Sequence, residues 1–271
     1  MEWNVRENSN WFTVSGTGLM YINNVGTISQ ALFARGNPDF DTVLSAQLQA
    51  TQVSIVSIAN CVGRIALGYA ADFGKHHWGW HRAYWMSVIS IIFILSQILM
   101  FNVEDVSSLW MPSVALGFAY GGMYGLFPTI MIELFGLGEL ASSCVWPHTD
   151  PSFQKVHFSQ NWGFLCLSPV VAGNLFSFVF GRNLDAHAPT PTDVYLELDY
   201  RPRGGLPSTD ARHQCLEGRL CYADSAKLTI VACFVSLSLS ILAATRVRRK
   251  KGQHQRPERE ETEVLWEGGN E

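Results

Sequence analysis

Residues 53–75 read VSIVSIANCVGRIALGYAADFGK. The first part of this stretch, Val53–Ala71, is 19 residues long and carries a single charge, Arg64. A helix needs roughly 20 mostly apolar residues to cross the hydrocarbon layer of a bilayer. The stretch therefore predicts a membrane-spanning helix that ends at a charged connection beginning with Asp72.

Five other segments have a similar length and carry no charge at all. They are Trp11–Phe33, Tyr84–Phe101, Leu109–Ile132, Trp162–Phe180 and Leu228–Thr245. A soluble protein can bury one apolar helix, but six such segments joined by polar connections are typical of a polytopic membrane protein. The hydrophobic content of 48% and the mean hydropathy of +0.10 hide this pattern, because long polar stretches dilute the average. We predict an all-α membrane protein with six transmembrane helices.

The charges predict how these spans are oriented. A basic cluster follows the sixth span directly and favours the cytoplasmic side: Arg246, Arg248, Arg249, Lys250 and Lys251. Counting back through six spans places the N-terminus in the cytoplasm as well. The predicted organisation is a cytoplasmic segment 1–10, a six-span unit 11–245 with a long external loop 181–227, and a cytoplasmic tail 246–271. No cleavable signal peptide is expected, and either the vacuolar or the plasma membrane fits.

The six cysteines divide by location. We expect Cys61, Cys166 and Cys233, which lie in spans, to be small packing residues, whereas Cys144 falls in an internal loop. Cys215 and Cys221 share the external loop, where an oxidising lumen would favour a disulfide between them. The alternatives are two unpaired thiols, or a metal pair with His213.

Charged residues predict an ion-pair cluster on the internal side. Asn60, Arg64, Gly68 and Asp72 are spaced four apart and therefore share one stripe of a helix. Arg64 lies about 12 Å along the helix from Asp72 at 1.5 Å per residue. Glu133 ends the fourth span on the same side. Two simpler interpretations stay open: Arg64 extends alone to the interface, and Glu133 is an ordinary interfacial acid.

Glycines and a proline in the fourth span predict close helix packing and a bend. Gly117, Gly121 and Gly125 are spaced four apart, so they form a ridge that a neighbouring helix can approach closely. The ridge can serve static packing or a surface that slides. Pro128 removes a backbone hydrogen bond and should bend the helix.

Four asparagines are candidates for a substrate path. Asn23 and Asn24 lie at the centre of the first span, Asn60 in the second and Asn174 in the fifth. An amide within a membrane needs a hydrogen-bond partner or water. These side chains either line a path or bond to another helix, and the sequence leaves both readings open.

No arrangement typical of an enzyme is found. The histidines show no His-Glu-x-x-His spacing, and there is no nucleophile elbow, P-loop or dinucleotide fingerprint. His76, His77 and His81 sit in a short loop with two tryptophans, which is typical of a headgroup contact rather than of a metal site. We expect no catalytic residue, metal, cofactor or nucleic-acid partner.

Several motifs together resemble a known family. GRIALGYAADFGK at residues 63–75, followed by Arg82, resembles the cytoplasmic signature loop of the major facilitator superfamily. GTGLMYINNVGTI at 16–28, ELFGL at 133–137 and HFSQNWGF at 157–164 resemble its nodulin-like branch, which includes fungal monocarboxylate-transporter homologues.

The resemblance implies the C-terminal six-helix half of a twelve-span bundle, whose mate is an N-terminal half or a second copy. Substrate would bind between the halves, and Arg64, Asp72, Arg82 and Glu133 would form an internal gate. The implied function is secondary transport of a small solute, an organic acid among the candidates. The alternative is a truncated membrane protein that does not transport and acts as an interaction partner.

The chain departs from the family pattern in two places. Residues 138–156 intervene between two motifs that normally follow each other almost directly, either as an internal loop or as untranslated sequence in a gene model. The segment before Gly16 is short and polar, so the first span is expected to be clipped. The substrate, the coupling ion and the membrane are not encoded in any recognisable motif.

Overall fold

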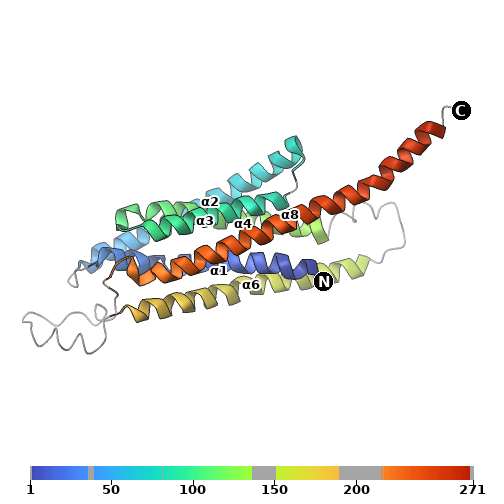
Figure 1. The fold of residues 1–271 in the computed structure, drawn as a ribbon. Coiled ribbons are helices and arrows are strands. Elements are labelled where there is room, and N and C mark those ends of the chain that lie inside the picture. Colours follow the sequence, from blue (N-terminus) through green and yellow to red (C-terminus); the bar gives the residue numbers. More distant parts are fainter. Residues whose placement is uncertain are drawn as a thin grey trace, which may run out of the picture.

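The computed structural model describes residues 2–35, 40–80, 82–135, 151–188, 215 and 217–268. Six long helices account for most of this part of the chain, and it contains no strand. They are α1 (Glu2–Phe33), α2 (Thr42–Trp78), α3 (Ala83–Asn102), α4 (Trp110–Phe135), α6 (Pro151–Ala186) and α8 (Leu220–Gly268), with a short 3-10 helix η1 (Val106–Ser108) before α4. Successive long helices run in alternating directions along one bundle, and the end of α8 extends beyond it (Figure 1).

Local sequence explains where α2 begins and ends. The side chain of Asp41 accepts hydrogen bonds from the backbone amides of Val43 and Leu44 at 2.9 and 3.3 Å, which satisfies amides that have no partner within the helix. At the other end Gly79 adopts a left-handed conformation with φ of 63°, and its amide donates to Gly74. Glycine reaches this conformation without the steric cost that a Cβ atom would add.

Three helices are long and apolar enough to cross a membrane within the described residues. These are Thr42–Trp78, Tyr84–Asn102 and Leu220–Leu242. The predicted spans in α1, α4 and α6 are helical. Taken together, these three helices carry a larger share of glycine, serine, asparagine and tyrosine than the three apolar helices do. The structure is therefore that of an integral, all-α membrane protein, and membrane crossing by α1, α4 and α6 stays a prediction.

The helix contacts show an internal two-fold pattern. The most extensive pairs are α2–α4, α1–α6, α3–α8, α3–α4 and α1–α8. If α1, α2 and α3 are exchanged for α4, α6 and α8 in that order, the α1–α6 pair becomes the α4–α2 pair and the α1–α8 pair becomes the α4–α3 pair. The α3–α8 pair is unchanged. Because α1 and α4 run in opposite directions (Figure 1), the two helix triplets are inverted relative to each other.

The core combines large apolar side chains with hydrogen bonds between helices. Tyr21, Phe93, Met123 and Phe127 are fully buried where the helices meet. Ser113 of α4 donates to Gln52 of α2 at 2.8 Å and lies 2.8 Å from the Tyr21 hydroxyl of α1. Since the amide oxygen of Gln52 can only accept, Ser113 accepts from Tyr21. This buried chain of hydrogen bonds joins three helices.

Candidate functional site

Arg64 lies on a face of α2 that the other helices leave exposed. Its Nε atom donates to Oδ1 of Asn60, one helical turn earlier, at 3.1 Å. The guanidinium therefore points along α2 away from Asp72. Because Nε is engaged by Asn60, the two terminal nitrogens of the guanidinium remain available to a planar anion.

Asp72 takes a different partner, at the end of α2. Its Oδ1 atom accepts from Nη2 of Arg82 at 2.6 Å and from Nε at 3.1 Å. The Asp72 side chain is 63% exposed and that of Arg82 20% exposed, so water weakens this ion pair. The pair bridges the short connection from α2 to α3, which Gly74 also fixes by packing against the Trp85 ring.

The predicted cluster of four charges is thus divided in the structure. Asp72 and Arg82 form one pair, while Arg64 belongs with Asn60. Arg64 and Asp72 stand about 12 Å apart along the helix and do not bond to each other, so a cluster that Glu133 would complete stays a prediction. The backbone of Glu133 lies in α4, but its side chain falls outside the described residues.

The glycine ridge of α4 packs against the part of α2 that carries Asn60 and Arg64. A Cβ atom at Gly117 would lie 2.6 Å from the carbonyl oxygen of Val56, and one at Gly125 would lie 3.2 Å from that of Arg64. Between them, a Cβ atom at Gly121 would overlap the carbonyl of Asn60. The two backbones therefore meet directly behind the exposed arginine.

Two tyrosines and a proline lie next to this ridge. Tyr120 donates to the hydroxyl of Tyr124 at 3.3 Å. Sequence reasoning missed these two tyrosines. Each directly precedes a glycine of the ridge, Gly121 or Gly125, and this spacing is the signal that could have found them. Pro128 lies within α4, which continues to Phe135. The predicted bend at Pro128 stays a prediction.

The asparagine candidates bond within their own helices. Asn24 donates to the carbonyl of Met20 at 2.8 Å, and Asn174 donates to that of Val170 at 2.7 Å. Asn23 and Asn174 are exposed, and Asn60 is half-buried. The printed bonds of Asn24, Asn60 and Asn174 thus stay within one helix each, and a role of the four asparagines in a substrate path stays a prediction.

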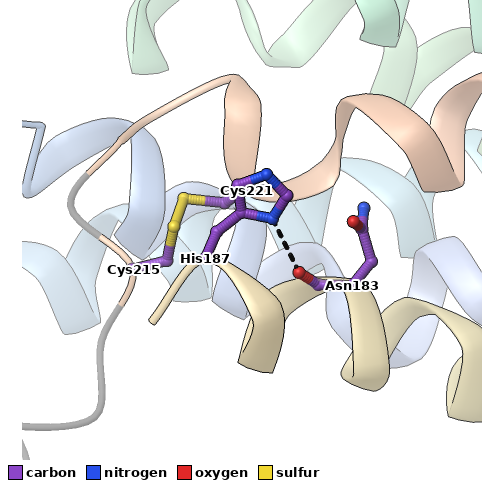
Figure 2. The surroundings of a disulfide bond; sticks show 4 residues. All are labelled: Asn183, His187, Cys215 and Cys221. Atoms are coloured by element: carbon purple, nitrogen blue, oxygen red, sulfur yellow. Dashed lines mark hydrogen bonds between the residues drawn. A yellow bond between two sulfur atoms is a disulfide. The ribbon is translucent and has the colours of Figure 1, made fainter. Parts of the chain in front are cut away.

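Cys215 and Cys221 form a disulfide at the start of α8, with a Cα–Cα distance of 6.0 Å (Figure 2). His213, Cys144 and His81 fall outside the described residues. Within the part that is described, no three histidine, cysteine or acidic side chains gather as a metal site would require.

The expectation that all three cysteines within spans are packing residues is wrong for two of them. Cys233 is buried, but Cys61 and Cys166 are exposed. They lie on sides of α2 and α6 that no other helix covers. Hydropathy places these residues in spans, but it does not tell which side of a helix has a neighbour.

Several curated fungal proteins are similar to this chain. A protein named uncharacterized membrane protein YMR155W from Saccharomyces cerevisiae is 23% identical over 252 residues, which cover 88% of this chain and 39% of that protein. Proteins named probable transporter MCH1 are 24% identical over 172 residues in Wickerhamomyces anomalus and 23% identical over 272 residues in Aspergillus fumigatus. The first of these matches covers 63% of this chain and 29% of the relative, and the second covers 89% and 38%.

The chain therefore spans well under half the length of the relatives it matches. No model of a known protein family matches it, and no solved structure does.

Proposed function

We propose that this chain acts in the transport of a small solute across a membrane, as one six-helix half of a major-facilitator-type secondary transporter. Two observations support the proposal. Relatives over most of the chain are named probable transporters. The inverted helix triplets also match the internal repeats from which such transporters are built.

The position of Arg64 carries the choice of substrate. A charged side chain within a span is costly in lipid, so it usually faces a water-filled path or another protein surface. Arg64 is exposed on α2, and its terminal guanidinium nitrogens are free of the bond to Asn60. A guanidinium binds a carboxylate through two parallel hydrogen bonds. We therefore favour a small organic acid as the solute.

The same exposed face calls for a partner. Only 22% of the most apolar window of α2 is buried within the bundle, compared with 44% for α3. Ile65 and Tyr69 flank Arg64 and are 70% and 73% exposed. A second six-helix unit over this face would shield Arg64 from lipid and enclose the path. The unit is either an N-terminal half or a second copy of this chain.

The ion pair between Asp72 and Arg82 is proposed as part of the gate on the internal side. It ties the end of α2 to the start of α3 and is accessible to water. An exposed pair contributes at most about 1 kcal/mol, which is small enough to break and re-form during a transport cycle.

Uptake into proteoliposomes tests the proposal. Purified chain is reconstituted and supplied with radiolabelled lactate, pyruvate or acetate, in parallel with empty liposomes. We expect uptake of at least one acid above the empty liposomes and its loss in Arg64→Ala. Ser57→Ala on the same exposed side of α2 is the control, since its hydroxyl bonds only to its own helix. Uptake equal to that of empty liposomes would contradict transport by a pair of copies of this chain.

A further inference from the structure

The turn that enters α8 (residues 215–222) is closed by a disulfide, and of its described residues Cys215, Gly218, Cys221 and Tyr222 are buried against other helices. Cys215 and Cys221 are 2% and 0% exposed, and both pack with Ala31 of α1 and Leu184 of α6. Between them Gly218 has φ of 64° and is buried against Arg35. A Cβ atom at Gly218 would lie 3.0 Å from Cδ of Arg35, so the turn fits closely over the end of α1.

Polar contacts connect the same turn to the entrance of α4. Arg219 forms an ion pair with Glu104 at 3.4 Å and stacks over the Phe101 ring at 5.3 Å. The hydroxyl of Tyr222 donates to the carbonyl of Val103 at 3.1 Å, and both groups are buried. These contacts hold the turn to the segment that leaves α3.

A further bond ties the start of α8 to α6. Asn183 donates to Ser225 at 3.1 Å, and His187 lies just beyond α6 with Nδ1 at 2.9 Å from the carbonyl of Asn183. Figure 2 shows Asn183 and His187 beside the disulfide at the end of α6. The turn thus reaches α1, α3 and α6 in addition to its own helix.

We propose that residues 215–222 form a redox-sensitive clamp, in which the disulfide keeps the turn folded and the turn holds the ends of α1, α3, α6 and α8 together. The clamp joins both helix triplets at one end of the bundle. It is separate from the Asp72–Arg82 pair, which lies at the opposite end. The inference does not depend on whether the chain transports a solute.

Reduction would open the clamp by thiol–disulfide exchange. A dithiol reductant supplies two electrons and two protons, becomes a cyclic disulfide itself, and leaves one thiol on Cys215 and one on Cys221. Cys215 is then joined to Cys221 only through the intervening backbone. Only a short turn, which carries Gly218 and Arg219, separates Cys215 from α8. When Cys215 leaves its contact with Ala31 and Leu184, this turn is released as well.

Hydrogen exchange of the full chain in detergent tests the clamp. We expect dithiothreitol to release two additional thiols and to accelerate amide exchange in residues 219–225 by about tenfold or more, while exchange in the middle of α3 stays unchanged. We also expect the unfolding midpoint to fall by roughly 3 °C or more. The variant Cys215→Ser with Cys221→Ser should exchange rapidly without reductant and should not respond to it.

The matched control is Cys61→Ser with Cys166→Ser, since these cysteines are exposed outside the turn. This variant should respond to dithiothreitol as the native chain does. If reduction of the folded chain releases no additional thiols, the turn is not redox-sensitive and the proposal fails, and reduction of the chain unfolded in denaturant then shows whether the disulfide is present at all. If thiols are released but exchange in 219–225 is unchanged, the disulfide does not act as a clamp. The wild-type comparison decides both points even if the serine variant does not fold.

Discussion

Arg64 donates its Nε hydrogen to Asn60, and its side chain is exposed on α2. This bond has two consequences. It fixes the side chain along α2, so less conformational freedom is lost when an anion binds. It also leaves Asp72 to pair with Arg82. The proposed anion-binding residue of α2 is therefore separate from the proposed gate pair at the internal end of the helix.

We predict that Arg64→Lys weakens substrate binding more than it slows the transport cycle. Lysine keeps the charge but cannot offer two parallel donors to a carboxylate. The KM for the transported acid should rise about tenfold, equivalent to about 1.4 kcal/mol, with a smaller change in maximal rate. Initial uptake rates over a range of concentrations measure this. An unchanged KM would remove Arg64 from the binding site.

The buried link from Tyr21 through Ser113 to Gln52 is a second feature at this scale. Ser113→Ala removes the middle of the chain and leaves two buried polar groups without their partner. We predict a loss of about 1–3 kcal/mol in the free energy of unfolding, seen as a lower thermal midpoint in detergent. Ser54→Ala is the control, because that serine is exposed and bonds to its own helix. Equal midpoints for the two variants would mean that the link contributes nothing.

Residue spacing predicted some of these relations and missed others. The shared stripe of Asn60 and Arg64 follows from their separation by four residues, and so does their hydrogen bond. The eight-residue separation of Arg64 and Asp72, about 12 Å along the helix, is too long for a direct bond between their side chains. The Tyr120–Tyr124 pair was missed because aromatic residues in a span are ordinarily read as packing.

At the scale of the elements, α2 and α4 form the closest-packed pair. Gly117 and Gly121 of α4 lie against α2, and Gly63 of α2 lies against the carbonyl of Phe118. Glycines on both helices therefore form one seam, which we expect to keep α2 and α4 together as a unit. Any movement of the exposed arginine would then carry α4 with it.

Gly121→Ala should disrupt this seam. The added methyl group overlaps the carbonyl of Asn60, which is backbone and has little room to yield. We predict a loss of about 1–3 kcal/mol in stability, measured by thermal unfolding in detergent.

Gly68→Ala is the matched control, because a Cβ atom there meets nothing within 4 Å. That substitution should be neutral or stabilising by up to about 1 kcal/mol, since alanine favours a helix. If Gly121→Ala is equally neutral, the two helices are not held by this seam.

The sequence predicted the elements better than their neighbours. Long, nearly uncharged segments located the six long helices of the described residues, and the four-residue glycine spacing located the seam. Which side of each helix would be covered depends on how six helices pack, and one apolar sequence fits several arrangements. This explains why Cys61 and Cys166 were expected to be buried and are exposed.

At the scale of the whole molecule, the disulfide and the basic cluster are consistent with one orientation. Disulfides persist in oxidising compartments, and basic clusters beside spans favour the cytoplasm. The disulfide lies at the start of α8, and the basic residues from Arg246 onward follow the apolar part of the same helix. The two signals therefore fall at opposite ends of the apolar part of α8, which is consistent with the predicted orientation.

Single cysteines test this orientation. In a chain with Cys61→Ser, Cys144→Ser and Cys166→Ser, we predict that Ser108→Cys reacts with a membrane-impermeant maleimide from the external or lumenal side. Trp80→Cys should react only from the cytoplasmic side. The two positions lie in the connections on either side of α3 and so at opposite ends of the bundle. Labelling of both from one side of sealed vesicles would contradict the predicted topology.

The exposure of Cys61 on α2 gives the molecule a chemical reporter of its own. This thiol follows Asn60 directly and precedes Arg64 by less than one turn. Maleimides react with the thiolate, which forms readily in water and poorly in hydrocarbon. The labelling rate of Cys61 therefore distinguishes lipid from water beside Arg64. A substrate or partner that covers this surface would be detected as slower labelling of Cys61, so no cysteine has to be introduced into the protein.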